Sequence, residues 1–460
     1  MLAALLIPLA VIIGVVLVAH ASANRAGAAP DAGSVPAGAR AVTPVLSFRR
    51  APDPLVITVR AKSLADSLSK VSDATQSSSC LTVAVEGRTV VQDNGDRVFL
   101  PGSNQKIITA AVALELLGAD ATFTTSVRGS LSGGTVKRMV LVGGGDPLLS
   151  TDRYPKLWMN QYPPTNITRV EQLVDDVVAA GVRRVDVLVG DASRYDKKTE
   201  APGWVNAITN RDAAPLSALM INDGYIGNGS ARRSSSTVGA LEVFRKLLEA
   251  RGVDVGSIAE GKSGGAPEIA SVSSVPMATI VQEMLTTSDN NTAELLVKEI
   301  GRQVSKTGST AAGTKVMKAT LESWGISMSS HVLADGSGLS DLNRVSCNTF
   351  VRILARSPED GPLYAGMAVA GKTGTLATYL KGTPAEGVMR AKTGTLKAAR
   401  ALSGFFPAKN DELIQFSFIV NGARAKTRAE RLWDDLAQAL ANYPGGAAPG
   451  DLGPRPVEAT

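Results

Sequence analysis

Histidine is nearly absent from this sequence. Only His20 and His331 occur among 460 residues, and His20 lies in an apolar run near the N-terminus. A serine–histidine triad would have to use His331 alone, and the His-x-x-x-His motif of metalloproteases does not occur. Two histidines and two cysteines at these positions also exclude a structural zinc site of ordinary spacing. Hydrolytic chemistry on this chain therefore needs another base, and lysine is the available residue.

Cysteine is equally scarce, with Cys80 and Cys347 as the only two. In a protein that is exported from the cytoplasm, two cysteines can form a disulfide. The alternative is a pair of buried free thiols that pack as small hydrophobic side chains. We favour the disulfide, and the sequence leaves the alternative open.

Long blocks of one charge are also missing. The formal net charge is +6 and the isoelectric point is near 9.2. No lysine-rich block and no alternation of basic and aromatic residues accompanies this surplus, so we expect no nucleic-acid binding. A solvated basic face accounts for the charge.

One long apolar run is present at the N-terminus. Residues 2–19 carry no charge, and patterns that resemble signal-peptidase sites follow at 19–21 and 21–23. We expect residues 1–21 to be a signal peptide or a membrane anchor, because such a run lies at the short end of what spans a bilayer. The sequence thus predicts an extracytoplasmic protein of the periplasm or cell wall. Residues 22–53 and 443–460 have the composition of a disordered linker and tail.

The stretch of residues 101–118 carries the first chemical motif. A loop places Ser103 at the start of an expected helix, Lys106 follows one turn later, and Gly118 ends the helix. At this spacing the two side chains share a face, so the amine can take the hydroxyl proton. The ordinary alternative is a capping serine with a surface lysine. A lysine on a helix that is otherwise largely apolar favours the catalytic interpretation.

A second motif, Ser288-Asp289-Asn290, lies on a turn between expected helices at 276–285 and 292–303. A hydroxyl and an amide on such a turn can both project into a cleft, where the hydroxyl can pass on a proton. Asp289 is expected to be only a turn residue. Taken alone, the tripeptide is ordinary turn chemistry.

A third motif, Lys-Thr-Gly, occurs at Lys306, Lys372 and Lys392. The copy at Lys306 follows the end of a helix and is interpreted as a turn. The other two are nearly identical in sequence, so their context must separate them. Only the copy at Lys392 leads directly into an expected strand pair, at 402–406 and 414–420, and we therefore select it.

The three motifs, in this order, resemble the signature set of penicillin-binding proteins and serine β-lactamases. The first two are too far apart for a compact β-lactamase. The chain is similar to class C low-molecular-mass penicillin-binding proteins, the D-alanyl-D-alanine carboxypeptidase/endopeptidase family, over roughly residues 54–442. Further stretches that match this family are 144–147, 214–217, 335–340 and 342–346.

This resemblance implies an α+β fold of the penicillin-recognising serine transpeptidase/β-lactamase type, with an antiparallel sheet flanked by helices. We expect a discontinuous catalytic domain at 54–120 and 275–442. One or two mainly β domains are expected at 121–274, where we find no chemically active motif. Strands at 136–142 and 184–189 and a helix at 170–180 are expected within this insertion.

The resemblance also implies catalytic roles. Ser103 would attack the carbonyl between two D-alanines of a peptidoglycan stem peptide and form an acyl-enzyme. Lys106 would be the base, and burial together with a like charge at Lys392 would lower its pKa. Ser288 would relay the proton to the leaving nitrogen. No metal or organic cofactor is called for, and β-lactam antibiotics would be covalent inhibitors.

Substrate binding is implied at the second and third motifs. Asn290 would hold the peptide backbone, while Lys392 and Thr393 would hold the terminal carboxylate. Gly394 lets the backbone approach the ligand closely. The backbone N–H groups of Ser103 and Thr395 would form the oxyanion hole. The residues Asp335, Ser337 and Asn343 are assigned to structure.

Two rival functions remain. A class A β-lactamase would carry a Glu-x-x-Leu-Asn element, and none follows Ser288 around Glu294, Glu299 or Glu322. A non-catalytic cell-wall-binding protein on the same fold would have no need of all the motif residues. Both carboxypeptidase and endopeptidase activity fit the motifs, because both cut after a D-alanine.

Overall fold

The computed structural model describes much of the chain outside its termini. The expected signal peptide or anchor lies outside the described residues, as does the linker up to residue 52. Within the described part, no helix combines the length and the apolar character that crossing a membrane requires. The described residues are 53–157, 164–208, 212–229 and 231–445.

The chain divides into two units. One consists of Met1–Val56 with Ala447–Thr460, and the other is Ile57–Gly446. The second unit contains all the sheets and core clusters of the described residues.

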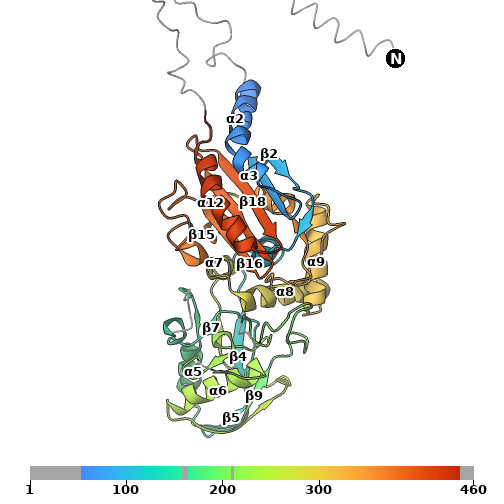
Figure 1. Ribbon diagram of the computed structural model, residues 1–460. Coiled ribbons are helices and arrows are strands. Elements are labelled where there is room, and N and C mark those ends of the chain that lie inside the picture. The colour runs from blue at the N-terminus through green and yellow to red at the C-terminus, as the bar shows by residue number, and fades with distance from the viewer. Residues whose placement is uncertain (1–52, 158–163, 209–211, 230, 446–460) are drawn as a thin grey trace, which may run out of the picture. The chain divides into compact units, whose positions relative to one another are not determined.

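A six-stranded antiparallel sheet underlies the candidate site. Its strand order is β15-β16-β17-β18-β1-β2. β1 and β18, from the beginning and the end of the unit, are neighbours (Figure 1). The expected strand pair at 402–406 and 414–420 is confirmed. The strands are β1 (Ser79–Val85), β2 (Arg88–Asp93), β15 (Ala368–Val369), β16 (Arg390–Leu396), β17 (Ala399–Pro407) and β18 (Leu413–Asn421).

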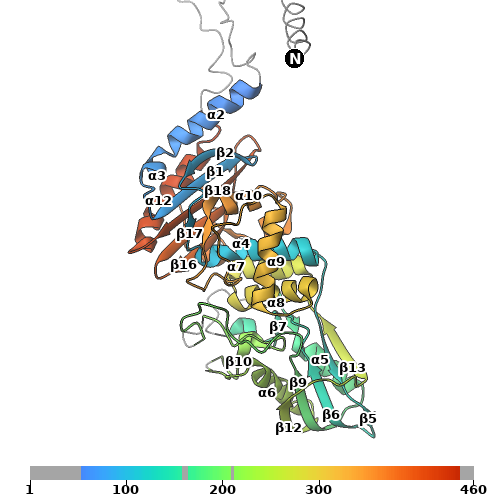
Figure 2. The same cartoon turned by 90° about the vertical axis from the view of Figure 1, so that its right-hand side faces the viewer.

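Helices cover both faces of this sheet, which explains why its central strands are almost continuously buried. Successive side chains point to opposite faces, so Phe405 packs in one core cluster and Phe406 in the other. α12 lies on one face, and α4, α7 and α10 lie on the other (Figure 2). The helices on the first face are α2 (Asp53–Ser67), α3 (Ser69–Asp73) and α12 (Ala425–Ala441). Those on the second are α4 (Gln105–Leu117), α7 (Met277–Thr287), α8 (Asn290–Ser305), α9 (Thr310–Ser323) and α10 (Cys347–Leu354).

A second sheet occupies the region expected to be inserted. Its order is β12-β9-β6-β4-β13, and β5 (Leu131–Ser132) pairs with β6. β6, β9 and β12 are parallel, whereas β4 and β13 pair in antiparallel fashion with their neighbours. The expected strands at 136–142 and 184–189 are confirmed. The strands are β4 (Thr124–Arg128), β6 (Thr135–Val142), β9 (Arg184–Asp191), β12 (Asp254–Glu260) and β13 (Glu268–Ser273).

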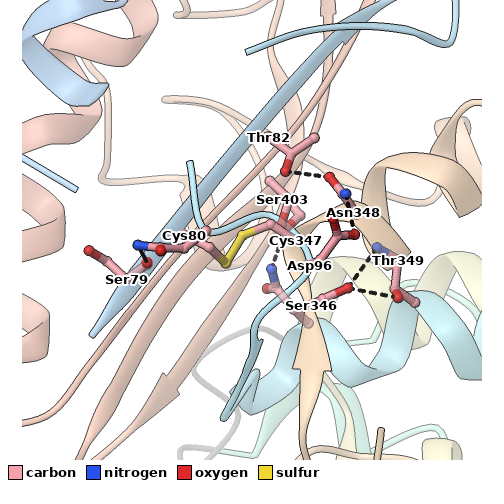
Figure 3. Close-up of a disulfide and its surroundings, with 12 residues drawn as sticks. Ser79, Cys80, Thr82, Asp96, Ser346, Cys347, Asn348, Thr349 and Ser403 are labelled. Carbon is pink, nitrogen blue, oxygen red and sulfur yellow. Dashed lines mark hydrogen bonds between the residues drawn. A yellow bond between two sulfur atoms is a disulfide. The ribbon is translucent and has the colours of Figure 1, made fainter. Parts of the chain in front are cut away.

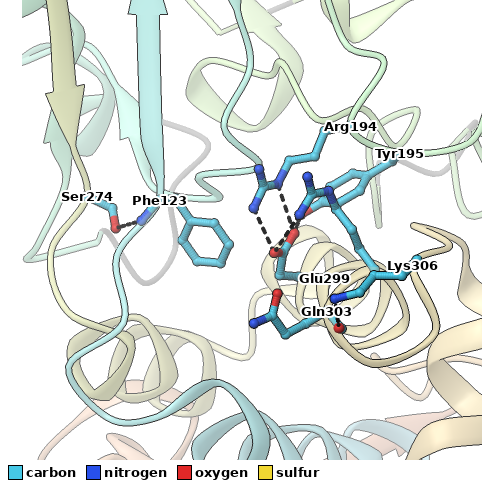
Figure 4. A network of polar contacts seen from close by, with 8 residues as sticks. Phe123, Arg194, Tyr195, Ser274, Glu299, Gln303 and Lys306 are labelled. Atoms are coloured by element: carbon cyan, nitrogen blue, oxygen red, sulfur yellow. Dashed lines mark hydrogen bonds and ion pairs between the residues drawn. The ribbon is translucent and has the colours of Figure 1, made fainter.

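Two α-helices accompany the strands of this mainly β region. α5 (Val170–Ala179), which was expected, and α6 (Ser236–Glu249), which was not, join the parallel strands. Parallel neighbours need such crossovers, because a tight turn cannot connect them. The chain enters and leaves this region side by side: Phe123 N donates to Ser274 Oγ at 2.9 Å, as Figure 4 shows.

The favoured disulfide is confirmed. Cys80 on β1 bonds to Cys347 at the start of α10, and both residues are buried (Figure 3). Beside it, Asn348 accepts a hydrogen bond from Thr82 at 2.8 Å and donates one to Asp96 at 2.6 Å. The disulfide and these bonds connect the sheet to the helical layer.

The expected boundary of the C-terminal tail is too early by at least one residue. Tyr443 is buried in the core cluster around Trp433, and its hydroxyl donates to Glu412 at 2.5 Å. An aromatic ring with a satisfied hydroxyl belongs to the packed structure.

Candidate active site

Lys106 is the centre of the candidate active site. It is fully buried on α4, directly after the short 3-10 turn Gly102–Asn104 that carries Ser103. Its Nζ lies 3.2 Å from Ser103 Oγ, 2.6 Å from Asn290 Oδ1 and 2.7 Å from the carbonyl oxygen of Ser337. One amine therefore joins the first and second motifs.

Glycines allow the backbone around Ser103 to pack closely. Gly102 has a φ of +54°, and a Cβ there would lie 2.9 Å from the backbone nitrogen of Thr395. A Cβ on Gly338 would lie 1.9 Å from the Gly102 carbonyl oxygen. Larger residues at either position would collide with backbone. The N–H of Thr395 is thereby brought next to the turn that holds Ser103.

The second motif lies between α7 and α8, as expected. Ser288 ends α7 in the left-handed conformation, and the side chain of Asp289 caps α8 by accepting from Thr292 N at 2.5 Å. This confirms Asp289 as a turn and capping residue. Asn290 accepts from Lys106, and its Nδ2 donates to the carbonyl oxygen of Asp212 at 2.8 Å.

The structure brings only the third of the Lys-Thr-Gly copies to this site. Lys392 Nζ, fully buried on β16, lies 2.8 Å from Ser288 Oγ. Lys306 is exposed at the end of α8, and the exposed Lys372 forms an ion pair with Glu386 at 2.8 Å. One lysine from each outer motif thus contacts the second motif: Lys106 contacts Asn290, and Lys392 contacts Ser288.

Both lysines have lowered pKa values. Burial lowers the pKa of the Lys106 amine to about 8, against the opposing effect of the nearby carboxyls Asp289, Asp335 and Glu294. Burial, followed by the positive charges of Lys106 and Arg400, holds the pKa of Lys392 well below its usual range. A lysine in such a setting is suited to act as a base.

A loop built around Asp335 supports the first motif. Its buried carboxyl accepts from Trp204 Nε1 at 3.0 Å and from Asn343 Nδ2 at 2.7 Å. Ser337 Oγ also donates to it, at 3.1 Å. These contacts agree with the structural assignment of Asp335, Ser337 and Asn343. The carbonyl of Ser337 additionally contacts Lys106, which the sequence did not indicate.

Sequence reasoning missed Arg400, which lies opposite Thr395 in the β16–β17 pair. Its guanidinium donates to Thr395 Oγ1, pairs with Glu430 at 2.8 Å and stacks over the ring of Trp433. A lone arginine within an otherwise apolar strand was the available signal, because a buried charge needs partners.

The inserted region also reaches the second motif. Asp212 accepts from Asn290, and the backbone nitrogen of Ala214 donates to Asn291 Oδ1 at 2.9 Å. Further along α8, Arg194 and Tyr195 bind the buried Glu299 (Figure 4). The sequence shows no chemically active motif in this region, yet its residues contact the second motif. Its contacts are made by backbone groups and scattered side chains, so no motif marks them.

Comparisons with known proteins identify the family of this chain. The family model described as "D-Ala-D-Ala carboxypeptidase 3 (S13) family" matches residues 60–234 and 228–443. A carboxypeptidase from Mycobacterium tuberculosis is 32% identical, over 77% of this chain and 79% of that protein. A D-alanyl-D-alanine carboxypeptidase from Actinomadura sp. (strain R39) is 31% identical, over 79% and 80%.

The crystal structure of penicillin binding protein 4 from Haemophilus influenzae is similar in fold. It is 20% identical in sequence, covers 82% of this chain and 99% of that chain, and has a TM-score of 0.66. The chain therefore belongs to the S13 family of D-Ala-D-Ala carboxypeptidases. It is a serine-type D-Ala-D-Ala carboxypeptidase on the penicillin-recognising fold, which confirms the resemblance seen in its motifs.

Proposed function

We propose that this enzyme removes the terminal D-alanine of peptidoglycan stem peptides through an acyl-enzyme on Ser103. The position of the buried Lys106 amine, 3.2 Å from Ser103 Oγ and with a pKa lowered to about 8, supports this most directly. A neutral amine at that distance can accept the hydroxyl proton as Oγ bonds to the substrate carbonyl carbon.

Ser288 and Lys392 complete the acylation step. When the amide C–N bond breaks, the leaving nitrogen takes a proton through Ser288, whose Oγ lies 2.8 Å from Lys392 Nζ. Free D-alanine departs and the Ser103 ester remains. Water then attacks the ester carbonyl and returns Ser103 to its hydroxyl form, so each cycle consumes one water and releases one D-alanine.

Backbone N–H groups of Ser103 and Thr395 serve as the oxyanion hole. The close packing of Gly102 against the Thr395 nitrogen supports this role, because it brings that nitrogen next to the turn that carries Ser103. Each such donor contributes about 3 kcal/mol to transition-state stabilisation in enzymes where it has been removed.

The third motif binds the substrate carboxylate. Lys392 and Thr393 lie on β16, with Gly394 beside them, and β15 pairs with β16 only at Arg390 and Ala391. A carboxylate that enters this site stabilises the charged form of the buried Lys392 amine. A D-Ala cross-link to a diamino acid that bears a carboxyl on the carbon of the acylated amine also presents a carboxylate beside the scissile amide, so the same site accepts it as a second substrate class.

β-Lactams acylate Ser103 as covalent inhibitors in this proposal, and the enzyme acts outside the cytoplasm, where its substrate is found. The apolar segment of residues 2–19 serves as the export signal or the membrane anchor.

Intact-protein mass after incubation with benzylpenicillin tests the proposal. We expect a stable adduct on the wild type, none on Ser103→Ala, and slower formation on Lys392→Ala. Lys372→Ala, which removes the exposed copy of the same motif, is the matched control and acylates normally. An adduct on Ser103→Ala contradicts the proposed nucleophile. Rapid turnover of penicillin without an adduct indicates a β-lactamase instead. D-alanine release from a peptide ending in D-Ala-D-Ala measures the reaction itself.

A further inference from the structure

The loop of residues 335–338 is held between α4 and α8 by buried side chains. From α4, Thr109 Oγ1 donates to the carbonyl oxygen of Gly336 at 2.8 Å, and Lys106 Nζ donates to that of Ser337 at 2.7 Å. From α8, Glu294 Oε1 accepts from the backbone nitrogens of Gly336 at 3.0 Å and Ser337 at 2.8 Å. Oε1 of Glu294 therefore holds Ser337, whose carbonyl oxygen contacts the proposed base Lys106.

We propose that Glu294 is a positioning residue for Lys106, holding Ser337 in place so that the lysine amine stays directed at Ser103 Oγ. This inference rests on the proposed function, because it takes Lys106 as the base. Glu294 is fully buried between apolar neighbours on α8. Burying a carboxyl costs free energy unless hydrogen bonds compensate for the lost hydration. Its two hydrogen bonds both go to the loop that supports Lys106.

The geometry suits a protonated carboxyl. Glu294 Oε1 accepts both N–H groups, whereas Oε2 is buried and has no hydrogen-bond partner among the described residues. Burial, followed by the negative charge of Asp335, raises the pKa of Glu294 to about 8. A proton on Oε2 leaves both hydrogen bonds at Oε1 intact at neutral pH. The charged groups that face this carboxyl are Asp335 on the loop and Lys106 on α4.

An ionised Glu294 would work against the base. A negative charge near the amine stabilises the ammonium form, and Glu294 acts on Lys106 in this direction together with Asp289 and Asp335. Keeping Glu294 neutral therefore keeps Lys106 available as a neutral amine. The two groups titrate as an interacting pair, so removing the charge of one must move the apparent pKa of the other.

The pH dependence of acylation separates this role from a purely structural one. Glu294→Gln keeps an oxygen acceptor for both N–H groups and cannot ionise. We expect its rate constant for acylation by benzylpenicillin, measured on the full chain between about pH 6 and pH 10, to rise at a pH lower than in the wild type by about half a unit or more. Glu294→Ala loses the acceptor, and we expect acylation at least about tenfold slower.

Glu299→Gln is the matched control, because Glu299 is a buried carboxyl on the same helix that pairs with Arg194 instead. It should leave the midpoint of the pH profile unchanged. If the midpoint of the pH profile of acylation is the same in Glu294→Gln as in the wild type, the inference is overturned. This holds even if Glu294→Ala fails to fold. Glu294→Ala with the wild-type rate and only a lower melting temperature also overturns it. A wild type that forms no adduct overturns the proposed function and this inference together, so the two failures are distinguishable.

Discussion

The phenol of Tyr154 donates a 2.5 Å hydrogen bond to the partly buried carboxyl of Asp223. Both residues belong to the region inserted between the first two motifs. Asp223 also accepts from Asn291 Nδ2 at 3.3 Å, and Asn291 directly follows the motif residue Asn290. The inserted region therefore supports the turn that carries the second motif, in addition to forming its own sheet.

Tyr154→Phe should slow acylation while leaving the fold intact. The variant removes one hydrogen bond to Asp223, a contribution of about 1 kcal/mol, which corresponds to a several-fold lower rate with benzylpenicillin. Tyr443→Phe is the matched control, since the hydroxyl of Tyr443, in the core cluster around Trp433, makes an equally short bond to Glu412. The control should lower the melting temperature without changing the acylation rate. Equal effects of both variants on acylation would contradict the role of Tyr154.

Asp223→Asn should change how stability depends on pH. Burial, followed by the charge of Asp289, raises the pKa of Asp223 from its ordinary 3.8 to about 7. Between these values the native state keeps a proton that the unfolded state has released, so this contribution to stability is lost as pH rises through about 7. Asparagine does not titrate.

The free energy of unfolding of the wild type, relative to Asp223→Asn, should therefore fall between about pH 4 and pH 7, by up to about 1.4 kcal/mol per pH unit. Urea unfolding at both pH values measures this difference. A difference that stays constant or grows with pH would argue against the raised pKa.

The motif residues of the site could be predicted from the sequence because their chemistry requires fixed local spacing. Ser103 and Lys106 are one helical turn apart, and Ser288 and Asn290 share one turn, so each pair is visible in a few letters. Selecting Lys392 over Lys372 required only the strands that follow it. The two core strands β17 and β18 were equally visible as apolar runs.

The remaining parts of the site depend on contacts between distant segments. Glu294 reaches the amide groups of residues 336 and 337 only after α8 has packed beside the loop. Tyr154 meets Asp223 through the fold of the inserted region. α6 was missed although Ser235 caps it, because serine clusters also occur in loops. These residues take their roles from contacts between segments that are far apart in the sequence, and a local sequence pattern does not reveal such contacts.

Lys106→Arg should slow acylation strongly. Arginine keeps the positive charge and the hydrogen-bonding capacity but does not lose its proton at any ordinary pH, so it cannot take the proton of Ser103. General-base contributions are on the order of 10²–10⁴-fold, and we expect a loss of this size in the rate with benzylpenicillin. Because burial lowers the pKa of Lys106 to about 8, the wild-type rate should rise with pH through that value. A rate that is flat or falling over this range would contradict a lysine base.

Removing the disulfide should separate stability from catalysis. Cys80 and Cys347 are 267 residues apart in sequence, so their bond closes a long loop in the unfolded chain. We expect the double alanine variant to lose about 2–5 kcal/mol of unfolding free energy, measured by urea denaturation.

The acylation rate of this variant, measured well below its melting temperature, should match that of the wild type. The disulfide joins β1 to α10, and neither cysteine contacts a motif residue through any described hydrogen bond. Reduction of the wild type with a thiol under mildly denaturing conditions should reproduce the same loss. A large drop in the acylation rate of a fully folded variant would instead show that the disulfide helps to position the active site through the sheet.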